Sequence, residues 1–284
     1  GGRFRHAAAV RQLSRMTGSP VDHPRAAEGP EGPKGPEGNV FFPGDDRLEG
    51  ILEWPGTGVR PGSGERREPG KPEPAGFAAG VSSVDLLGGV VVAHPHPLHG
   101  GTMAQPVVYR VAQSCRQRGL ATLRFNFRGV GASKGRFSGT EEYRDVEAAA
   151  AFLSDRLVAP YAGSAPHPPA WPLALAGYSF GSAMAARAAA GIGAVRALAL
   201  VGFVVNWDEL PGDTLQRLAA FRGPVLAVCA ENDDLGYPEE VEKVMRDLGL
   251  DFRISVIEGA GHFLEGIQRD VGERVAAFLS EALA

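Results

Sequence analysis

The chain has 284 residues, 44% of them hydrophobic and 22% charged, which is the composition of an ordinary globular protein. Its formal net charge is -4 and it has no basic stripe, so the sequence argues against a nucleic-acid partner and favours a small molecule. No apolar run is long enough to cross a membrane, and a soluble protein is expected. The two cysteines, Cys115 and Cys229, fall in apolar segments, which favours buried thiols in a reducing compartment over a disulfide.

The first 38 residues are expected to form a flexible tail, ahead of one α/β domain at 39–284. The tail contains GPEGPKGPEG, which is too rich in glycine, proline and charge to bury an apolar face. The chain does not begin with methionine, and its first twenty residues carry no acid but four arginines: Arg3, Arg5, Arg11 and Arg15. This pattern fits the remnant of a plastid or mitochondrial targeting peptide, a cloned fragment or a basic tail, so the expected location is the cytoplasm or an organelle interior.

The chain from residue 39 onward alternates between strand-like and helix-like segments. VFF at 40–42 and RLEGILEW at 47–54 predict a hairpin at the sheet edge, followed by a Pro/Gly-rich surface insertion at 55–80. Further strands are expected at 89–93, 121–127, 173–176, 195–203, 224–230 and 252–258, and helices at 102–118, 140–157, 213–221, 238–248 and 263–283. A proline-rich loop is expected at 158–170. This alternation predicts a mostly parallel, doubly wound α/β sheet of about eight strands, covered on both faces by helices.

The stretch around Ser179 has the pattern of a nucleophile elbow. The apolar run at 173–176 leads into the pentapeptide GYSFG at 177–181 and then into an alanine-rich segment of helical composition. A serine at such a strand-turn-helix corner has a strained backbone and an exposed hydroxyl, and the flanking glycines prevent collisions between strand and helix. We therefore predict that Ser179 is a nucleophile.

Residues suited to activate this serine follow two later strands, at the sheet edge where parallel sheets bind ligands. ENDD occupies 231–234, and GAGHF occupies 259–263. An imidazole takes the proton of a nucleophilic serine, and a buried carboxylate holds that imidazole in the correct tautomer. We predict His262 as the base and Asp233 as the acid, with Asp234 and Asp208 as alternatives for the acid.

HPHPLHGG at 94–101 follows the apolar strand at 89–93 and is expected to supply one backbone N–H of an oxyanion hole. The other N–H would come from Phe180, the residue after the nucleophile. Because Pro95 and Pro97 have no N–H, His96 between them is the predicted donor, with Leu98 as the second choice.

The same segment supports a rival hypothesis, in which three histidines bind a metal ion. The spacing H-x-H-x-x-H resembles the first signature of metallo-β-lactamase-like hydrolases and would use His94, His96 and His99. Leu98, however, stands where that signature has aspartate, and His262 is the one other histidine at a convincing strand end. The serine mechanism is preferred, and it requires neither a metal nor another cofactor.

Four motifs, HPHPLHGGTM, RFNFRGVGASKG, GYSFGS and GAGHF, together resemble the α/β-hydrolase superfamily. More narrowly, they resemble a bacterial and plastid-lineage group of small hydrolases related to dienelactone hydrolases. The resemblance runs from about Arg47 to the end of the chain and implies the roles assigned above to Ser179, His262 and Asp233. Asn126 stands where many superfamily members have aspartate. Dienelactone hydrolases use a cysteine nucleophile, so their substrate is not carried over.

The segment between residues 203 and 224 is too short for the large helical cap that many members of the superfamily insert there. An open site for small or flexible acyl groups is therefore expected. These features predict a serine esterase that cleaves a carboxylic ester, or a thioester, through an acyl-enzyme. Two alternatives remain: a catalytically silent small-molecule-binding protein on the same fold, and a metal-dependent hydrolase built on the histidine loop.

Overall fold

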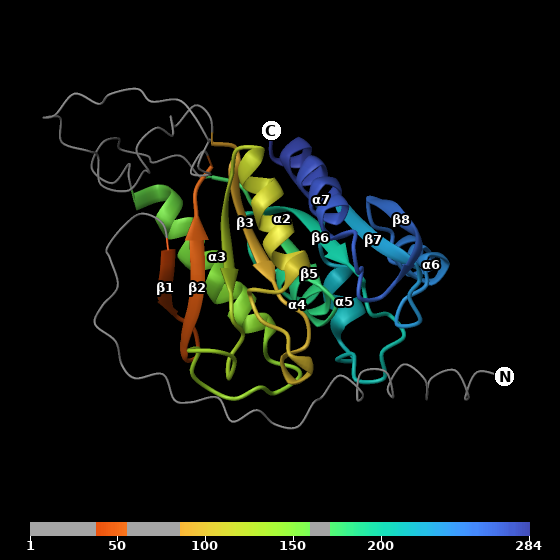
Figure 1. Cartoon of the computed structure of the whole chain (residues 1–284), viewed down its shortest axis with the longest axis horizontal. Helices are drawn as coiled ribbons and strands as arrows, with labels where there is room; N and C mark the ends of the chain where they lie inside the picture. The colour runs from red at the N-terminus through yellow and green to blue at the C-terminus, as the bar shows by residue number, and fades with distance from the viewer. Residues whose placement is uncertain (1–37, 56–85, 160–170) are drawn as a thin grey trace, which may run out of the picture.

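The structure, a computed structural model, describes residues 38–55, 86–159 and 171–284 (Figure 1). The expected tail up to residue 37, nearly all of the expected insertion at 55–80 and most of the proline-rich loop at 158–170 lie outside these residues. Within the described ranges, no helix combines the length and the apolar character needed to span a membrane.

The described strands form one eight-stranded sheet with the order β1-β2-β4-β3-β5-β6-β7-β8. Its edge is the predicted antiparallel hairpin of β1 and β2, and β2 also runs antiparallel to β4. All other neighbouring strands pair in parallel, which confirms the predicted fold class. The strands are β1 (Gly38–Pro43), β2 (Arg47–Glu53), β3 (Gly88–Ala93), β4 (Leu120–Phe125), β5 (Leu173–Tyr178), β6 (Val195–Val201), β7 (Val225–Asn232) and β8 (Phe252–Gly261).

Helices cover both faces of the sheet (Figure 1). One face carries α3 (Tyr143–Val158), α4 (Phe180–Ala189) and α6 (Pro238–Asp247), and the other carries α2 (Pro106–Gln117) and α7 (Gln268–Leu283). Every residue of β3, β4 and β5 is buried, as expected for parallel strands with helices on both sides. These buried strands therefore hold in place the segments that follow them, including the histidine loop and the GYSFG turn.

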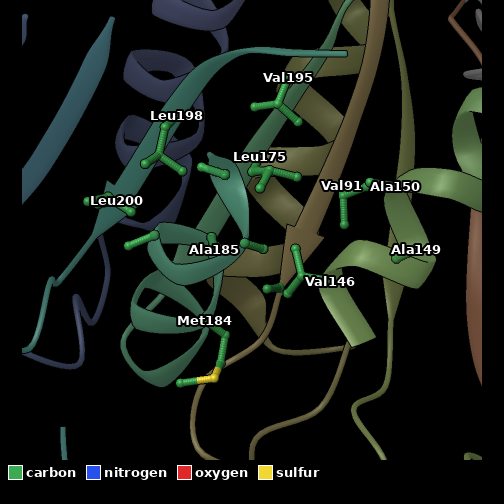
Figure 2. Close-up of a cluster of buried hydrophobic side chains, with 14 of the residues drawn as sticks. Val91, Val146, Ala149, Ala150, Leu175, Met184, Ala185, Val195, Leu198 and Leu200 are labelled. Atoms are coloured by element: carbon green, nitrogen blue, oxygen red, sulfur yellow. The ribbon is translucent and has the colours of Figure 1, made fainter. Parts of the chain in front are cut away.

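The core beneath α3 and α4 fixes the position of the nucleophile elbow (Figure 2). Large aliphatic side chains from three strands face the two helices, and alanines on the helices allow a close approach to the sheet. Each buried large side chain contributes about 1.5–3 kcal/mol to folding. The labelled members are Val91, Val146, Ala149, Ala150, Leu175, Met184, Ala185, Val195, Leu198 and Leu200.

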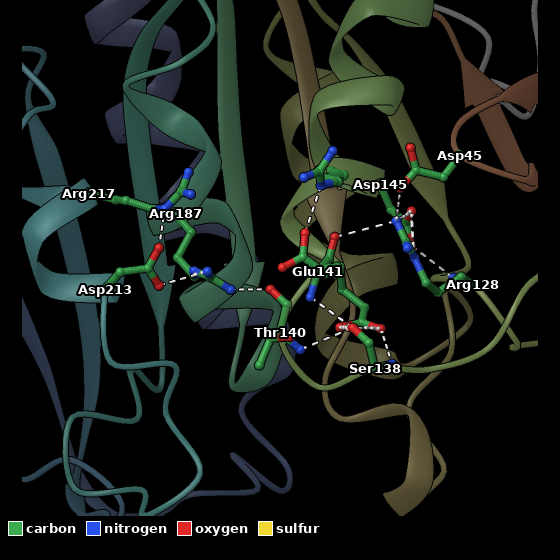
Figure 3. Close-up of polar contacts among 11 residues, drawn as sticks. Asp45, Arg128, Ser138, Thr140, Glu141, Asp145, Arg187, Asp213 and Arg217 are labelled. Atoms are coloured by element: carbon green, nitrogen blue, oxygen red, sulfur yellow. Dashed lines mark hydrogen bonds and ion pairs between the residues drawn. The ribbon is translucent and has the colours of Figure 1, made fainter.

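Polar contacts tie the far end of α4 to its neighbours (Figure 3). The side chain of Arg187 is only 4% exposed and pairs with Asp213 at 2.7 Å. It also donates to the carbonyl of Thr140 and stacks on the ring of Tyr143 at 4.6 Å. Since Thr140 precedes α3 and Asp213 precedes α5 (Thr214–Leu218), these contacts link α4 to the first turns of both helices.

The helices α2, α7 and α5 are shorter than predicted by the widest margins. α2 begins at Pro106 rather than at residue 102, because proline is favoured in the first turn, where its missing N–H costs nothing. α7 begins at Gln268 rather than at residue 263, because Leu264 and Gly266 have positive φ angles of 52° and 79°. α5 is the one helix in the described segment between β6 and β7, and it is too short to form the large cap that the sequence also argued against.

Candidate active site

Ser179 occupies a sharp corner between β5 and α4. Its φ and ψ angles are 56° and -120°, a strained combination for a residue with a side chain. The glycines on either side make this corner feasible: a Cβ on Gly181 would lie 2.5 Å from the carbonyl oxygens of Ala93 and His94, and one on Gly177 would collide with the backbone of Gly181. The geometry is that of the nucleophile elbow expected from GYSFG.

The structure brings Ser179, His262 and Asp233 together in one hydrogen-bonded chain. Ser179 Oγ lies 2.8 Å from His262 Nε2, and His262 Nδ1 lies 2.8 Å and 2.9 Å from the two carboxylate oxygens of Asp233. Because a carboxylate only accepts hydrogen bonds, Nδ1 carries the proton and Nε2 is free to accept from the serine hydroxyl. All three residues are buried, with Ser179 and His262 each 9% exposed and Asp233 fully enclosed.

Neighbouring groups hold the imidazole and carboxylate in place. Asp233 Oδ1 also accepts from the N–H of Leu235 at 3.1 Å, and Tyr178 donates its hydroxyl to the carbonyl of His262 at 2.9 Å. Burial raises the pKa of Tyr178, which keeps this hydroxyl protonated as a donor. Gly202, beside the ring, has a φ of 54°, a backbone conformation that favours glycine.

Sequence reasoning missed both Tyr178 and Gly202. Tyr178 lies inside the GYSFG motif, but its partner is 84 residues further along the chain, so only the fold reveals the contact. The other two carboxylates considered for the acid lie elsewhere. Asp234 lines a groove on the outer side of His262, and Asp208 is exposed in the segment before α5.

His94 is a buried structural residue. Its Nδ1 lies 2.6 Å from the carbonyl of Pro95, and its Nε2 lies 3.1 Å from the backbone nitrogen of Phe127. An N–H can only donate, so Nε2 accepts from Phe127 and Nδ1 donates to Pro95. Burial lowers the pKa of His94 to about 4, and the ring is therefore neutral at pH 7.

His96 accepts three hydrogen bonds from backbone N–H groups of the histidine loop. Its carbonyl accepts from the N–H groups of His99 and Gly101, both at 3.1 Å. Its Nδ1 accepts from the N–H of Leu98 at 3.2 Å. The N–H of Leu98, the second choice for the oxyanion hole, is therefore used inside the loop, whereas the N–H of His96 takes no part in these turns.

Asn126, identified from the sequence only as a departure from a family pattern, anchors the end of this loop. Its Oδ1 accepts from the N–H of Met103 at 2.9 Å, and its Nδ2 donates to Glu49 at 2.8 Å. It thereby connects the histidine loop, the end of β4 and strand β2. The amide is required here because one side of Asn126 meets a donor and the other meets a carboxylate.

The three histidines of the loop do not converge as metal ligands. Both nitrogens of His94 and one nitrogen of His96 are engaged by the backbone, and His99 is exposed. No cluster of three or more histidine, cysteine, aspartate or glutamate side chains suited to a metal occurs among the residues the structure covers. Cys115 and Cys229 are buried, and burial raises the pKa of each thiol to about 12, so neither is a reactive thiolate.

Two hollows meet at His262. The first, here called the small pocket, has a volume of about 30 Å³ and is lined by Ser179, His262, His96, His99, Phe180, Val204, Trp207 and Leu235. The second, here called the outer groove, has about 510 Å³ and is lined by residues at 232, 234–235, 237 and 259–265. The outer groove is open and carries the carboxylates of Asp234 and Glu265. His262 lines both hollows, so parts of one substrate that lie in different hollows can contact the same residue.

Known proteins agree with this architecture. An uncharacterized protein of Rickettsia prowazekii is 29% identical over 181 residues, which are 61% of this chain and 70% of that protein. The solved structure of an alpha-beta serine hydrolase homologue from Coxiella burnetii is 25% identical, with a TM-score of 0.64 over 85% of this chain and 97% of that one. A Xanthomonas campestris structure, described as an a/b serine hydrolase without lid, is 23% identical, with a TM-score of 0.59 over 90% and 94% of the two chains.

The family comparison covers most of the chain that follows the hairpin. Residues 89–283 match the family described as "Alpha/beta hydrolase domain", a range that contains the elbow, the histidine loop and both strand-end segments. By its sequence and its fold, the chain belongs to the alpha/beta hydrolase family.

Proposed function

We propose that this protein is a serine esterase that cleaves carboxylic esters with short acyl groups through an acyl-enzyme. The observation that carries the proposal is the unbroken hydrogen-bonded chain from Ser179 Oγ through His262 to Asp233, with both links at 2.8 Å. A neutral imidazole in contact with a hydroxyl, and held from behind by a carboxylate, is the arrangement that activates serine.

In the first half of the reaction, Ser179 Oγ attacks the ester carbonyl while its proton passes to His262 Nε2. Asp233 stabilises the imidazolium that forms and keeps Nδ1 protonated. The tetrahedral intermediate then collapses, the carbon–oxygen bond to the alcohol breaks, and His262 returns the proton to the departing oxygen. In the second half, water loses a proton to His262 and attacks the acyl carbon. The bond between that carbon and Ser179 Oγ then breaks, His262 returns the proton to Oγ, and the acid leaves.

The backbone N–H groups of Phe180 and His96 are proposed to stabilise the oxyanion. Phe180 is the first residue of α4, where N–H groups have no partner within the helix and the helix dipole favours negative charge. The N–H of His96 lies at the end of β3, beside the elbow, and the loop turns do not use it. Donors held in place before reaction are worth about 2.7–4 kcal/mol of barrier each.

The two hollows suggest where each part of an ester binds. The small pocket next to Ser179 has room for only a few water molecules, which suits a short acyl chain against Phe180, Val204 and Trp207. The outer groove is larger and touches the same imidazole that protonates the leaving oxygen, which suits the alcohol. Carboxylates in the outer groove oppose highly anionic leaving groups, so a carboxylic ester is proposed rather than a thioester of an anionic carrier.

The test is labelling with a fluorophosphonate probe, which reacts with activated serines. The wild type should become labelled, Ser179→Ala should not, and Ser280→Ala, which removes a partly exposed hydroxyl on α7, should label like the wild type. Labelling should also survive a chelator, because the proposed chemistry uses no metal. Turnover of p-nitrophenyl butanoate should follow the same pattern.

A folded wild type that does not react with the probe would overturn the proposal. Retained ligand binding without turnover would then support a catalytically silent binding protein on this fold. Activity that survives in Ser179→Ala but disappears with a chelator would instead support the metal-dependent alternative.

A further inference from the structure

His96 has a side-chain donor that neither the proposed mechanism nor the fold uses. Its Nδ1 accepts from the N–H of Leu98 at 3.2 Å, so in the neutral ring the proton sits on Nε2. Burial, together with the nearby ring of His99, lowers the pKa of His96 to about 4, and the ring is neutral at pH 7. Nε2 is therefore an N–H group, and it is buried without a hydrogen-bond partner among the described residues.

Aromatic rings enclose this imidazole on several sides. The ring centroids of His99, Phe137, Phe180 and Trp207 lie 4.6, 4.9, 5.2 and 5.5 Å from that of His96. The residue is only 9% exposed, so water does not readily replace a missing acceptor. A buried polar group without a partner is uncommon and often marks a site that a ligand completes.

The position of His96 tells which ligand could complete it. His96 lines the small pocket together with Ser179 and His262. In the proposed mechanism, the proton moves between these last two residues. Of the remaining lining side chains, Phe180, Val204, Trp207 and Leu235 have no hydrogen-bond acceptor, and His99, whose ring could accept, makes no hydrogen bond to Nε2. An acceptor for Nε2–H inside this pocket would therefore come from the acyl part of a substrate.

We propose that the Nε2–H of His96 binds an acceptor oxygen carried by the substrate's acyl chain, close to the scissile carbonyl. The inference rests on the proposed function and deepens it: the preferred substrates are esters of short acids with an ether, keto or hydroxyl oxygen in the chain. The backbone N–H of the same residue serves the oxyanion, so one residue contacts the substrate twice.

The test uses two p-nitrophenyl esters with acyl chains of equal length. Butanoate has a CH₂ group where methoxyacetate has an ether oxygen, and the ratio of their kcat/KM values, divided by the ratio of their uncatalysed rates, measures recognition of that oxygen. His96→Phe keeps an aromatic ring and the backbone N–H but removes the donor. We expect this ratio to fall about tenfold in His96→Phe, the value of one hydrogen bond.

Two further variants keep the test decisive if the phenylalanine disturbs folding. Gln at position 96 can place an amide N–H near Nε2, whereas Asn places its amide near Nδ1. His96→Gln should therefore retain most of the ratio, and His96→Asn should lose it. The ratio does not depend on the fraction of active protein, so partial unfolding does not imitate the effect.

The outcomes separate this inference from the function beneath it. Equal ratios in the wild type, His96→Phe and His96→Asn would overturn the inference and leave the imidazole as a packing residue, even if butanoate is turned over normally. A wild type that neither reacts with the fluorophosphonate probe nor hydrolyses butanoate would overturn the proposed esterase function itself.

Discussion

Two neighbouring aspartates in ENDD have different environments. Asp233 is fully buried and accepts hydrogen bonds from His262 Nδ1 and from the N–H of Leu235. Asp234, one residue later, is partly exposed and lines the outer groove. Sequence order alone left the two as competing candidates, because the turn after β7 decides which carboxylate faces the imidazole.

Asp233→Asn is expected to reduce kcat by about 10³–10⁴-fold with little change in KM. The asparagine amide would donate to Nδ1 and move the ring proton to Nε2, which then cannot accept the proton of Ser179. The matched change Asp234→Asn should alter kcat for p-nitrophenyl butanoate by less than about twofold, since this carboxylate does not contact the ring. Equal losses in the two variants, with both folded, would show that the acid is not Asp233.

The sequence predicts those site residues whose roles are encoded by residues next to them in the chain. GYSFG encodes the elbow within five residues, and the strand-end positions of Asp233 and His262 follow from the alternation of strands and helices. The different states of His94 and His96 could not be predicted, since both are histidines beside prolines. Phe127 determines one and Leu98 the other, and the first of these partners is 33 residues away.

At the scale of elements, the sequence predicted the order of strands and helices and the start of α6 at Pro238, but α2 and α7 begin later than predicted. The residues at 102–105 have helical spacing, yet the chain turns there so that Met103 can donate to Asn126. The asparagine at position 126 is explained by a contact with another strand. Glu49 on β2 accepts hydrogen bonds from the amide of Asn126 and from the N–H of Ala132. Such pairings between distant segments leave no trace in local periodicity.

Asn126→Asp should lower the free energy of unfolding by about 2 kcal/mol at pH 7. The new carboxylate would face Glu49 at hydrogen-bond distance, with no proton between the two oxygens. Adding Glu49→Gln to the same chain should recover part of the loss, because an amide again meets a carboxylate while the N–H of Ala132 loses its acceptor. Urea denaturation of the two single variants, the double variant and the wild type would measure this; additive losses in the double variant would contradict it.

The loop between β3 and α2 should make the fold sensitive to acid. Burial lowers the pKa of His94 from 6.5 to about 4, so the unfolded chain binds a proton on this ring at a higher pH than the folded protein does. Stability is therefore complete above pH 6.5 and is lost as the pH falls towards 4, by about 2 kcal/mol at pH 5. His96 acts in the same direction.

His94→Asn tests this contribution, since asparagine can still donate to the carbonyl of Pro95 but does not titrate. The variant should be less stable than the wild type at pH 7, and its unfolding free energy should fall less between pH 7 and pH 5, by about 2 kcal/mol. Urea denaturation at the two pH values measures the change in unfolding free energy between pH 7 and pH 5 for both proteins. An equal change in unfolding free energy in the wild type and in His94→Asn would show that the fold does not keep the His94 ring neutral.

At the scale of the whole molecule, the parallel sheet gathers the chemistry at one edge. The histidine loop, the elbow, and the segments after β7 and β8 follow the carboxyl ends of β3, β5, β7 and β8. These ends lie along the same edge of the sheet, so residues between 94 and 265 meet there. Only the short α5 lies between β6 and β7 in the described chain, so no large helical cap covers the site, although Val204 and Trp207 of this segment line the small pocket. The chain has a net charge of -4, and two of its carboxylates, Asp234 and Glu265, line the outer groove.

This location of charge predicts a preference among leaving groups. Butanoylcholine and 3,3-dimethylbutyl butanoate have alcohols of nearly the same shape, but only the first is cationic. If the alcohol occupies the outer groove, the choline ester should be preferred by about three- to tenfold in kcat/KM at low salt, and about 0.5 M salt should remove most of the preference. Combining Asp234→Asn with Glu265→Gln should remove it at low salt as well, while hydrolysis of the neutral ester stays nearly constant. A preference that survives both salt and the double variant would show that Asp234 and Glu265 do not select the alcohol.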